Sequence, residues 1–240
     1  MAAKLRLDQA LVTRGLTGTR SQAESYIKLG QVKVADRVVS KAGFLVGEAD
    51  TIELTAPDQY VSRAALKLAS VAEALELDFQ NKTVLDVGSS TGGFTDYALR
   101  HGARKVIAVE VGTNQLHPSL HGNPKIELHE KTDIRSFATK DKIDLAVADV
   151  SFISLREILP AVAKLSHRQT RIAAMVKPQF EAGRDALKHK GVIKNDKMRR
   201  DILKGFETWA QEYFVIEGKA DSAVQGAKGN RERFYLLRKA

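Results

Sequence analysis

The sequence of 240 residues contains no cysteine, and none of its hydrophobic runs is long enough to cross a membrane. Without cysteine the chain cannot form disulfides, thiolate metal sites or cysteine nucleophiles, which also excludes RNA cytosine-C5 methylation through a cysteine adduct. A membrane span needs about 20 consecutive apolar residues, and the N-terminus lacks the three regions of a signal peptide. These absences predict a cytoplasmic globular protein of one or two domains.

Positive charge is in excess. The chain has 38 Lys and Arg against 29 Asp and Glu, which gives a net charge of +9 at pH 7. Such a surface attracts polyanions through their phosphates, so nucleic acid is a candidate partner. A basic surface that is merely solvated is an equally good interpretation of the charge alone.

The chain divides into a small N-terminal module and a larger C-terminal domain. Two stretches within the first 30 residues have apolar side chains at helical spacing and end on glycine, and three short stretches typical of strands follow. A polar segment with a proline then interrupts the pattern. We therefore predict a module over residues 1–58, a linker over 59–62 and a second domain over 63–240.

From Thr83 onward, near-continuous apolar stretches alternate with helical patterns. This alternation predicts an α/β fold with a mostly parallel sheet that is covered by helices on both faces. Sheets of this kind bind ligands at the carboxyl ends of their strands. The residues directly after each apolar stretch are therefore the candidates for a functional site.

A loop of small residues follows the first of these strands. The dinucleotide fingerprint needs glycine at three positions, here Gly88, Ser90 and Gly93, so its middle glycine is missing. This disfavours a pyrophosphate cofactor, and with it a nicotinamide oxidoreductase, whereas the loop's N–H groups and hydroxyls suit the carboxylate of S-adenosylmethionine. The residues that we expect to bind this cofactor are Asp86, Gly88, Ser89, Ser90, Thr91, Gly92, Gly93, Phe94 and Thr95.

Two further acidic residues stand where the next strands are expected to end. Glu110 ends the second strand, where a carboxylate can accept both hydroxyls of a ribose. Asp133 is placed to bind the amino group of an adenine. Each of Asp86 and Asp133 could instead cap a loop, but the spacing of the acids at successive strand ends favours an adenosine cofactor.

Asp149 and Lys177 each come directly after an apolar strand, so both are expected at the same edge of the sheet as the glycine loop. Desolvation lowers the pKa of a lysine and a nearby carboxylate raises it, so the pair is either a proton-transfer site or a structural ion pair. A zinc site is not expected, because Pro118 separates His117 from His121 and no further ligand pattern is present. Phe152, near Asp149, is a candidate for stacking on a base.

Taken together, these stretches resemble the TlyA, or haemolysin A, family of ribosomal RNA ribose 2′-O-methyltransferases, which have an FtsJ-like catalytic domain. The resemblance implies a Rossmann-like class I methyltransferase domain, preceded by a small α+β domain of the alpha-L RNA-binding type. It covers nearly the whole chain. The stretches that carry it, in the family's order, are "VSRAALKLA", "DVGSSTGGFTD", "AVEVGTNQL", "DVSFISLREILP", "MVKPQFEAGR", "HKGVIKND" and "GAKGNRERF".

The resemblance implies a catalytic set of Lys67, Asp149, Lys177 and Glu232, of which Lys67 and Glu232 rest on the resemblance alone. It also implies a metal-free reaction on ribosomal RNA or a ribosomal subunit, at a cytidine of the large subunit, with the small subunit as a further candidate. We take Lys177 as the base and Lys67 as the alternative. A catalytically silent RNA-binding protein and a membrane-active haemolysin stay open as alternative functions.

The N-terminal module is expected to grip structured RNA through exposed cations. The candidates in this module are Arg6, Arg20, Lys28 and Lys33, although a solvated helix face would explain each of these four equally well. Arg63, at the start of the second domain, is a further candidate for RNA contact. Two departures from the family pattern stand out. Glu110 occupies a position where Asp is usual, and "VADRVV" at 34–39 replaces an Asn-Gly turn, which predicts a different hairpin within the same fold.

Overall fold

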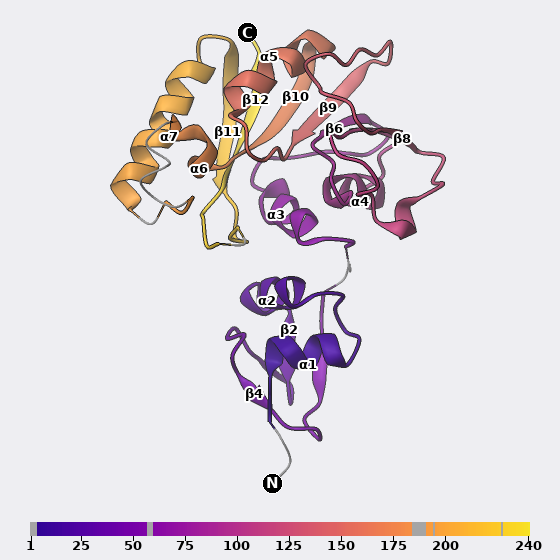
Figure 1. The fold of residues 1–240 in the computed structure, drawn as a ribbon, viewed down its shortest axis with the longest axis vertical. Helices are drawn as coiled ribbons and strands as arrows, with labels where there is room; N and C mark the ends of the chain where they lie inside the picture. The colour runs from indigo at the N-terminus through magenta and orange to yellow at the C-terminus, as the bar shows by residue number, and fades with distance from the viewer. Residues whose placement is uncertain (1–3, 57–59, 184–190, 194, 227) are drawn as a thin grey trace.

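The computed structural model describes residues 4–56, 60–183, 191–193, 195–226 and 228–240. The chain folds into a small N-terminal part and a larger α/β part, which meet where helix α2 (Arg20–Lys28) lies beside helix α3 (Arg63–Ala72) (Figure 1). Part of the expected linker, residue 59, lies outside the described residues, as does the expected domain boundary at residue 58. No helix in the described part of the chain is long and apolar enough to cross a membrane.

The N-terminal part packs two helices against short antiparallel strands. Helix α1 (Leu7–Thr13) lies against α2 (Arg20–Lys28), and their inner faces bury Leu11, Tyr26 and Ile27 completely. Both predicted helices are therefore confirmed. The strands are β1 (Leu5–Arg6), β2 (Val32–Val34), β3 (Arg37–Val38), β4 (Leu45–Val46) and β5 (Ile52–Leu54), in the sheets β3-β2-β5 and β1-β4.

The hairpin between β2 and β3 corrects one prediction. Its two-residue loop, Ala35 and Asp36, has φ values of 47° and 62°, and Val34 pairs with Arg37 across it. Positive φ at both central residues is the pattern of the type I′ turn that Asn-Gly favours. The expectation of a different hairpin was wrong, because the twist of the two strands imposes this turn even on an unfavourable sequence.

The larger part is built on a seven-stranded sheet of order β11-β12-β10-β9-β6-β7-β8. The strands from β6 to β10 run parallel, and β12 is antiparallel to both of its neighbours. The predicted mostly parallel sheet is thus confirmed. The strands are β6 (Thr83–Val87), β7 (Lys105–Val109), β8 (Ile126–His129), β9 (Ile143–Ala148), β10 (Ser166–Val176), β11 (Phe214–Asp221) and β12 (Arg233–Lys239).

Helices cover both faces of this sheet, which is why its central strands are apolar throughout. Successive residues of a strand face opposite sides, and Phe234 packs in the core beneath α3 and α4 whereas Tyr235 packs beneath α5 and α7. The first core continues into the N-terminal part and reaches Tyr26 of α2. The helices are α3 (Arg63–Ala72), α4 (Gly93–Arg100), η1 (Pro118–Leu120), α5 (Leu155–Leu165), α6 (Pro178–Glu181) and α7 (Asp196–Ala210).

Candidate active site

The carboxyl ends of the parallel strands border two neighbouring cavities. The larger has a volume of about 580 Å³, and its lining includes Glu110, Asp133 and Phe152. The smaller, of about 130 Å³, is lined by residues that include Asp86 and Lys177. Both cavities share part of the glycine loop and Asp149. The structure thus brings the predicted cofactor loop and the predicted strand-end residues to one place.

The glycine loop runs close to the neighbouring strand end. At Gly88, φ is +79°, and a Cβ atom there would lie 2.9 Å from the carbonyl oxygen of Asp149. Only glycine combines this left-handed conformation with so close an approach of two chain segments. Ser89 follows, and its Oγ is buried without a hydrogen-bond partner among the described residues.

Glu110 is turned back onto the loops that surround it. Its Oε2 accepts a hydrogen bond from the backbone N of Ser90 (2.9 Å), and its Oε1 accepts one from the backbone N of Gly112 (2.7 Å). A carboxylate oxygen has two acceptor sites, so each oxygen keeps one for a ligand hydroxyl. The extra methylene that distinguishes Glu from Asp is therefore accommodated by these backbone contacts.

Asp133 borders the larger cavity but is already engaged. The guanidinium of Arg135 donates to both of its oxygens, with Nε–Oδ1 and Nη2–Oδ2 distances of 3.0 and 2.7 Å. These hydrogen bonds lower the pKa of Asp133 below its ordinary value. The sequence analysis missed this pair. An adenine that contacts Asp133 would therefore share the carboxylate oxygens with Arg135.

Asp86 is fully buried at the end of β6. Thr95 Oγ1 donates to its Oδ2 at 2.6 Å, and its Oδ1 has no partner among the described residues. Burial raises the pKa of this carboxyl to about 7, and the nearby charges of Asp149 and Glu110 add to the shift. Two unsatisfied buried oxygens, on Asp86 and Ser89, thus belong to residues that line the smaller cavity, and a ligand with polar hydrogens fits there.

Lys177 and Asp149 form a nearly buried ion pair between the ends of β10 and β9. The Nζ–Oδ1 distance is 2.5 Å, and the side chains are 10% and 16% exposed. Lys177 Nζ also donates to Ser151 Oγ at 2.7 Å. Strand-end reasoning placed these two residues at one edge of the sheet, and the structure shows that they are in contact there.

Lys67 and Glu232 form a second buried ion pair. Lys67 lies on α3 and Glu232 directly precedes β12, and their Nζ and Oε2 atoms are 2.5 Å apart. Ala64, one turn before Lys67, lines the smaller cavity together with Asp149 and Lys177. The four residues that the family resemblance implied are therefore arranged as two ion pairs. Lys177 and Asp149 line the smaller cavity, whereas Lys67 is connected to it through Ala64 of the same helix.

An exposed aromatic ring stands beside the Lys177 pair. Phe152 is 91% exposed and has a φ of +66°, and its ring centroid lies 5.2 Å from that of Phe180. Glu181 fixes the loop that carries Phe152, because it accepts hydrogen bonds from Ser154 Oγ and from the backbone N of Leu155. No sequence pattern pointed to Glu181, because its partners lie 26 and 27 residues away.

The five predicted RNA-contact residues are in different situations. Arg6 and Arg20 both pair with the buried Asp8, at 3.0 and 2.9 Å. Lys33 lies 3.7 Å from Glu53, Arg63 donates to Ser21 Oγ, and Lys28 is exposed at the end of α2. Two of the predicted RNA contacts thus also balance a buried carboxylate, which the sequence analysis overlooked.

No group of three or more histidine or acidic residues that could hold a metal ion occurs among the described residues. His117 contacts Ser119, and His121 contacts the carbonyl oxygen of Leu116. The two histidines therefore have local partners.

Comparison with known proteins agrees with this arrangement. The FtsJ-like methyltransferase family matches residues 60–239, and the S4 domain matches residues 5–52. The 16S/23S rRNA (cytidine-2′-O)-methyltransferase TlyA of Mycobacterium tuberculosis is 36% identical over 99% of this chain and 91% of its own length. The 23S rRNA (cytidine-2′-O)-methyltransferase TlyA of Campylobacter jejuni is 43% identical over 73% of this chain and 70% of its own.

A solved structure shows the same fold. A candidate hemolysin from Streptococcus thermophilus covers 100% of this chain and 90% of its own, with a TM-score of 0.72 and 33% identity. More distant methyltransferases, such as NodS from Bradyrhizobium japonicum at 14% identity and a TM-score of 0.51, share the fold of the larger part. The chain therefore belongs to the TlyA family, with an S4 domain followed by an FtsJ-like methyltransferase domain.

Proposed function

We propose that this protein is a cytoplasmic ribosomal RNA ribose 2′-O-methyltransferase that uses S-adenosylmethionine and acts on a cytidine of the large subunit, with the small subunit as a further substrate. The observation that carries the proposal is the ion pair of Lys177 and Asp149, which lies where the cofactor loop and both cavities meet. The S4 domain and the relatives named for rRNA methylation support the choice of substrate.

The residues around the cavities fit the cofactor. When bound, S-adenosylmethionine supplies a methyl group on a positively charged sulfur. Glu110 has free acceptor positions for ribose hydroxyls, and Asp133 borders the part of the cavity suited to the adenine. Asp86 Oδ1 and Ser89 Oγ are the unsatisfied atoms that would take the polar end of the ligand. Among the other loop residues, Gly88, Ser90, Thr91 and Phe94 line the smaller cavity, and Thr95 donates to Asp86. Gly92 and Gly93 line neither cavity and pack behind the loop, against Leu116 and Ser62 respectively.

The protein contributes a proton acceptor to the reaction, together with side chains that hold this acceptor and the ribose in position. A ribose 2′-hydroxyl becomes a good nucleophile as it loses its proton. Lys177 Nζ, once it has released to solvent the proton that it carries in the ion pair with Asp149, would accept the hydroxyl proton. General-base help of this kind contributes about 10²–10⁴-fold. Asp149 and Ser151 hold the amine in place, and Lys67 with Glu232 orients the ribose. Lys67 is the alternative base.

The exposed ring of Phe152 offers a surface for the target base. It stands next to Phe180, whose ring centre lies 5.9 Å from Lys177 Nζ. A base stacked on Phe152 would place its ribose near the amine.

The test is transfer of radiolabelled methyl from S-adenosylmethionine to purified ribosomal subunits and to naked rRNA. Lys177→Ala should abolish turnover and leave cofactor binding nearly intact, because Lys177 acts on the hydroxyl proton; Asp149→Ala is assayed beside it. Label in the ribose of one rRNA that disappears in both variants would support the proposal. Bound cofactor and rRNA without any label would favour a silent RNA-binding protein, and leakage from liposomes would favour a haemolysin.

A further inference from the structure

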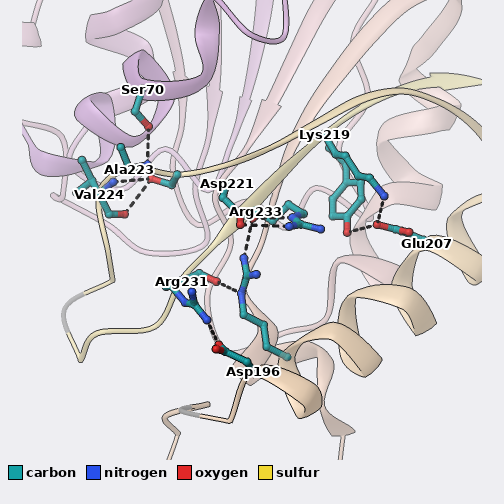
Figure 2. A network of polar contacts seen from close by, with 12 residues as sticks. Ser70, Asp196, Glu207, Lys219, Asp221, Ala223, Val224, Arg231 and Arg233 are labelled. Carbon is teal, nitrogen blue, oxygen red and sulfur yellow. Dashed lines mark hydrogen bonds and ion pairs between the residues drawn. The ribbon is translucent and has the colours of Figure 1, made fainter. Parts of the chain in front are cut away.

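The chain around Glu232 is tied to helix α7 (Figure 2). Arg199 of α7 has a side chain that is only 7% exposed. Its Nε donates to the carbonyl oxygen of Arg231 at 3.0 Å, and its Nη2 donates to Asp221 Oδ1 at 2.7 Å. One buried guanidinium therefore fixes the residue immediately before Glu232 to the end of β11.

Asp221 holds the residue on the other side of Glu232. It lies opposite Arg233 in the β11–β12 ladder and accepts hydrogen bonds from Arg233 Nε (2.6 Å) and Nη2 (3.1 Å), as Figure 2 shows. Burial alone would raise the pKa of Asp221, but the hydrogen bonds from Arg233 and Arg199 outweigh it and lower the pKa. We call Arg199, Asp221 and Arg233 the Arg199 clamp.

The β11–β12 hairpin also contacts α3, the helix that carries Lys67. The backbone N of Ala223 donates to Ser70 Oγ at 3.2 Å, as Figure 2 shows. The Ser70 hydroxyl in turn donates to the carbonyl oxygen of Lys67 at 2.7 Å. The backbone N of Ser222 donates to the carbonyl oxygen of Glu232 at 3.0 Å. The β11–β12 hairpin therefore contacts both α7 and α3. A shift of this hairpin would change the position of Glu232 relative to Lys67.

We propose that Arg199 and Asp221 are positioning residues for methyl transfer, which set the placement of Glu232 against Lys67. This inference rests on the proposed function. Arg199 lines neither cavity at the strand ends, so it acts through the backbone of Arg231 and the carboxylate of Asp221. An ion pair between two nearly buried side chains depends steeply on their separation, so a shift of the hairpin changes the arrangement that the reaction needs.

The test compares Arg199→Gln, Arg199→Lys and Asp221→Asn with the matched control Lys219→Gln. Lys219 also joins the hairpin to α7, through Glu207 at 3.0 Å, but it lies opposite Tyr235 in the ladder, away from Glu232. We expect Arg199→Gln and Asp221→Asn to lower kcat by about 10–100-fold, as for a misplacement of about 1 Å. The KM for rRNA and the Kd for S-adenosylmethionine should stay unchanged, and Arg199→Lys should recover part of the rate.

Hydrogen exchange in residues 222–226 and 228–232 provides a second measurement that does not depend on turnover. Faster exchange there in Arg199→Gln but not in Lys219→Gln supports the clamp, and equal exchange overturns it. Unchanged kcat in Arg199→Gln, or an equal loss in Lys219→Gln, also overturns it. A wild-type protein without methyl transfer would contradict the proposed function and, with it, the positioning role, and hydrogen exchange would then show only whether Arg199 holds the hairpin.

Discussion

The pKa values of two buried aspartates, Asp86 and Asp8, are shifted in opposite directions. Asp86 is surrounded by acids and apolar side chains, and burial raises its pKa to about 7. Burial also acts on Asp8, but hydrogen bonds from Arg6 and Arg20 outweigh it, so the pKa of Asp8 is lowered. The two carboxyls therefore make the free energy of unfolding depend on pH with opposite signs.

Asp86→Asn should stabilise the protein at pH 8 and have little effect near pH 4. Between 3.8, the unfolded value, and about 7, the folded state holds a proton that the unfolded state has lost, so wild-type stability falls as pH rises. A shift of this size corresponds to at most about 4 kcal/mol. Urea unfolding of both proteins between pH 4 and 8 measures the difference. A constant difference across this range would show that Asp86 does not titrate as described.

Asp8→Asn should have the opposite effect on stability, because it should destabilise the protein at neutral pH and have less effect at acid pH. The ionised Asp8 stabilises the folded state at neutral pH, and this stabilisation is lost as pH falls below 3.8 and through the lowered folded value. Arg6 and Arg20 are half exposed and can be solvated once their partner is lost, so removing the Asp8 charge should cost about 1–3 kcal/mol at pH 7. Thermal unfolding at pH 7 and pH 3 provides the comparison. A loss that is equally large at pH 3 would point to packing instead of charge.

A site residue could be predicted from the sequence only where it occupies a position that the fold makes recognisable, such as the end of a buried strand. Asp149 and Lys177 stand directly after buried strands, so parallel-sheet geometry brings them together. Lys67 sits in an ordinary amphipathic helix and Glu232 in a polar loop, 165 residues apart, and only the family resemblance identified them. Arg199 resembles any other cation of a charged helix, because its partners lie far away in sequence.

At the scale of elements, the β2–β3 hairpin is a site of local strain. Ala35 adopts a φ of 47°, which costs a residue with a Cβ about 1–2 kcal/mol. Replacing Ala35-Asp36 by Asn-Gly should therefore stabilise the S4 domain by about 1 kcal/mol, because the turn keeps its shape with residues that prefer it. A higher thermal midpoint would confirm this. Gly15→Ala, at a φ of 71° in open space, is the opposite control and should lower the midpoint.

Helices α1, α2 and α7 follow their apolar spacing and were predictable, as were the short strands β2, β3 and β5. Strands β1 and β4 have two residues each, carry no periodic signal and were not predicted. The position of β12 between β10 and β11 depends on pairing across the sheet, and a sequence pattern cannot show it.

At the scale of the whole molecule, hydrogen bonds join the S4 domain to the catalytic domain in the described part of the chain. Gln22 Nε2 donates to the carbonyl oxygen of Tyr60 (2.7 Å), and Arg63 Nη1 donates to Ser21 Oγ (2.7 Å). The hydrophobic core is continuous across the same junction. The S4 domain and the cavities at the strand ends thus belong to connected parts of one molecule.

The net charge predicts how RNA binding responds to salt. Lys28→Glu, at the exposed end of α2, should weaken rRNA binding and reduce the slope of log affinity against log salt by about 1. Lys125→Glu makes the same charge change where β8 begins, at the edge of the sheet away from the cavities, and should have a smaller effect. Binding titrations at several salt concentrations measure both. Equal effects would mean that overall charge, and not the S4 surface, attracts RNA.

The late strand β12 has a consequence for the order in which the enzyme is synthesised. The cofactor loop, Asp149 and Lys177 all precede residue 178, but β10 keeps an unpaired edge until β12 is made, and Glu232 stands just before that strand. A nascent chain that ends before residue 232 would already contain the cavity residues named above but would lack Glu232, and with it the complete proposed catalytic set. Methyl transfer as proposed would therefore begin only after β12 has been synthesised and has paired with β10.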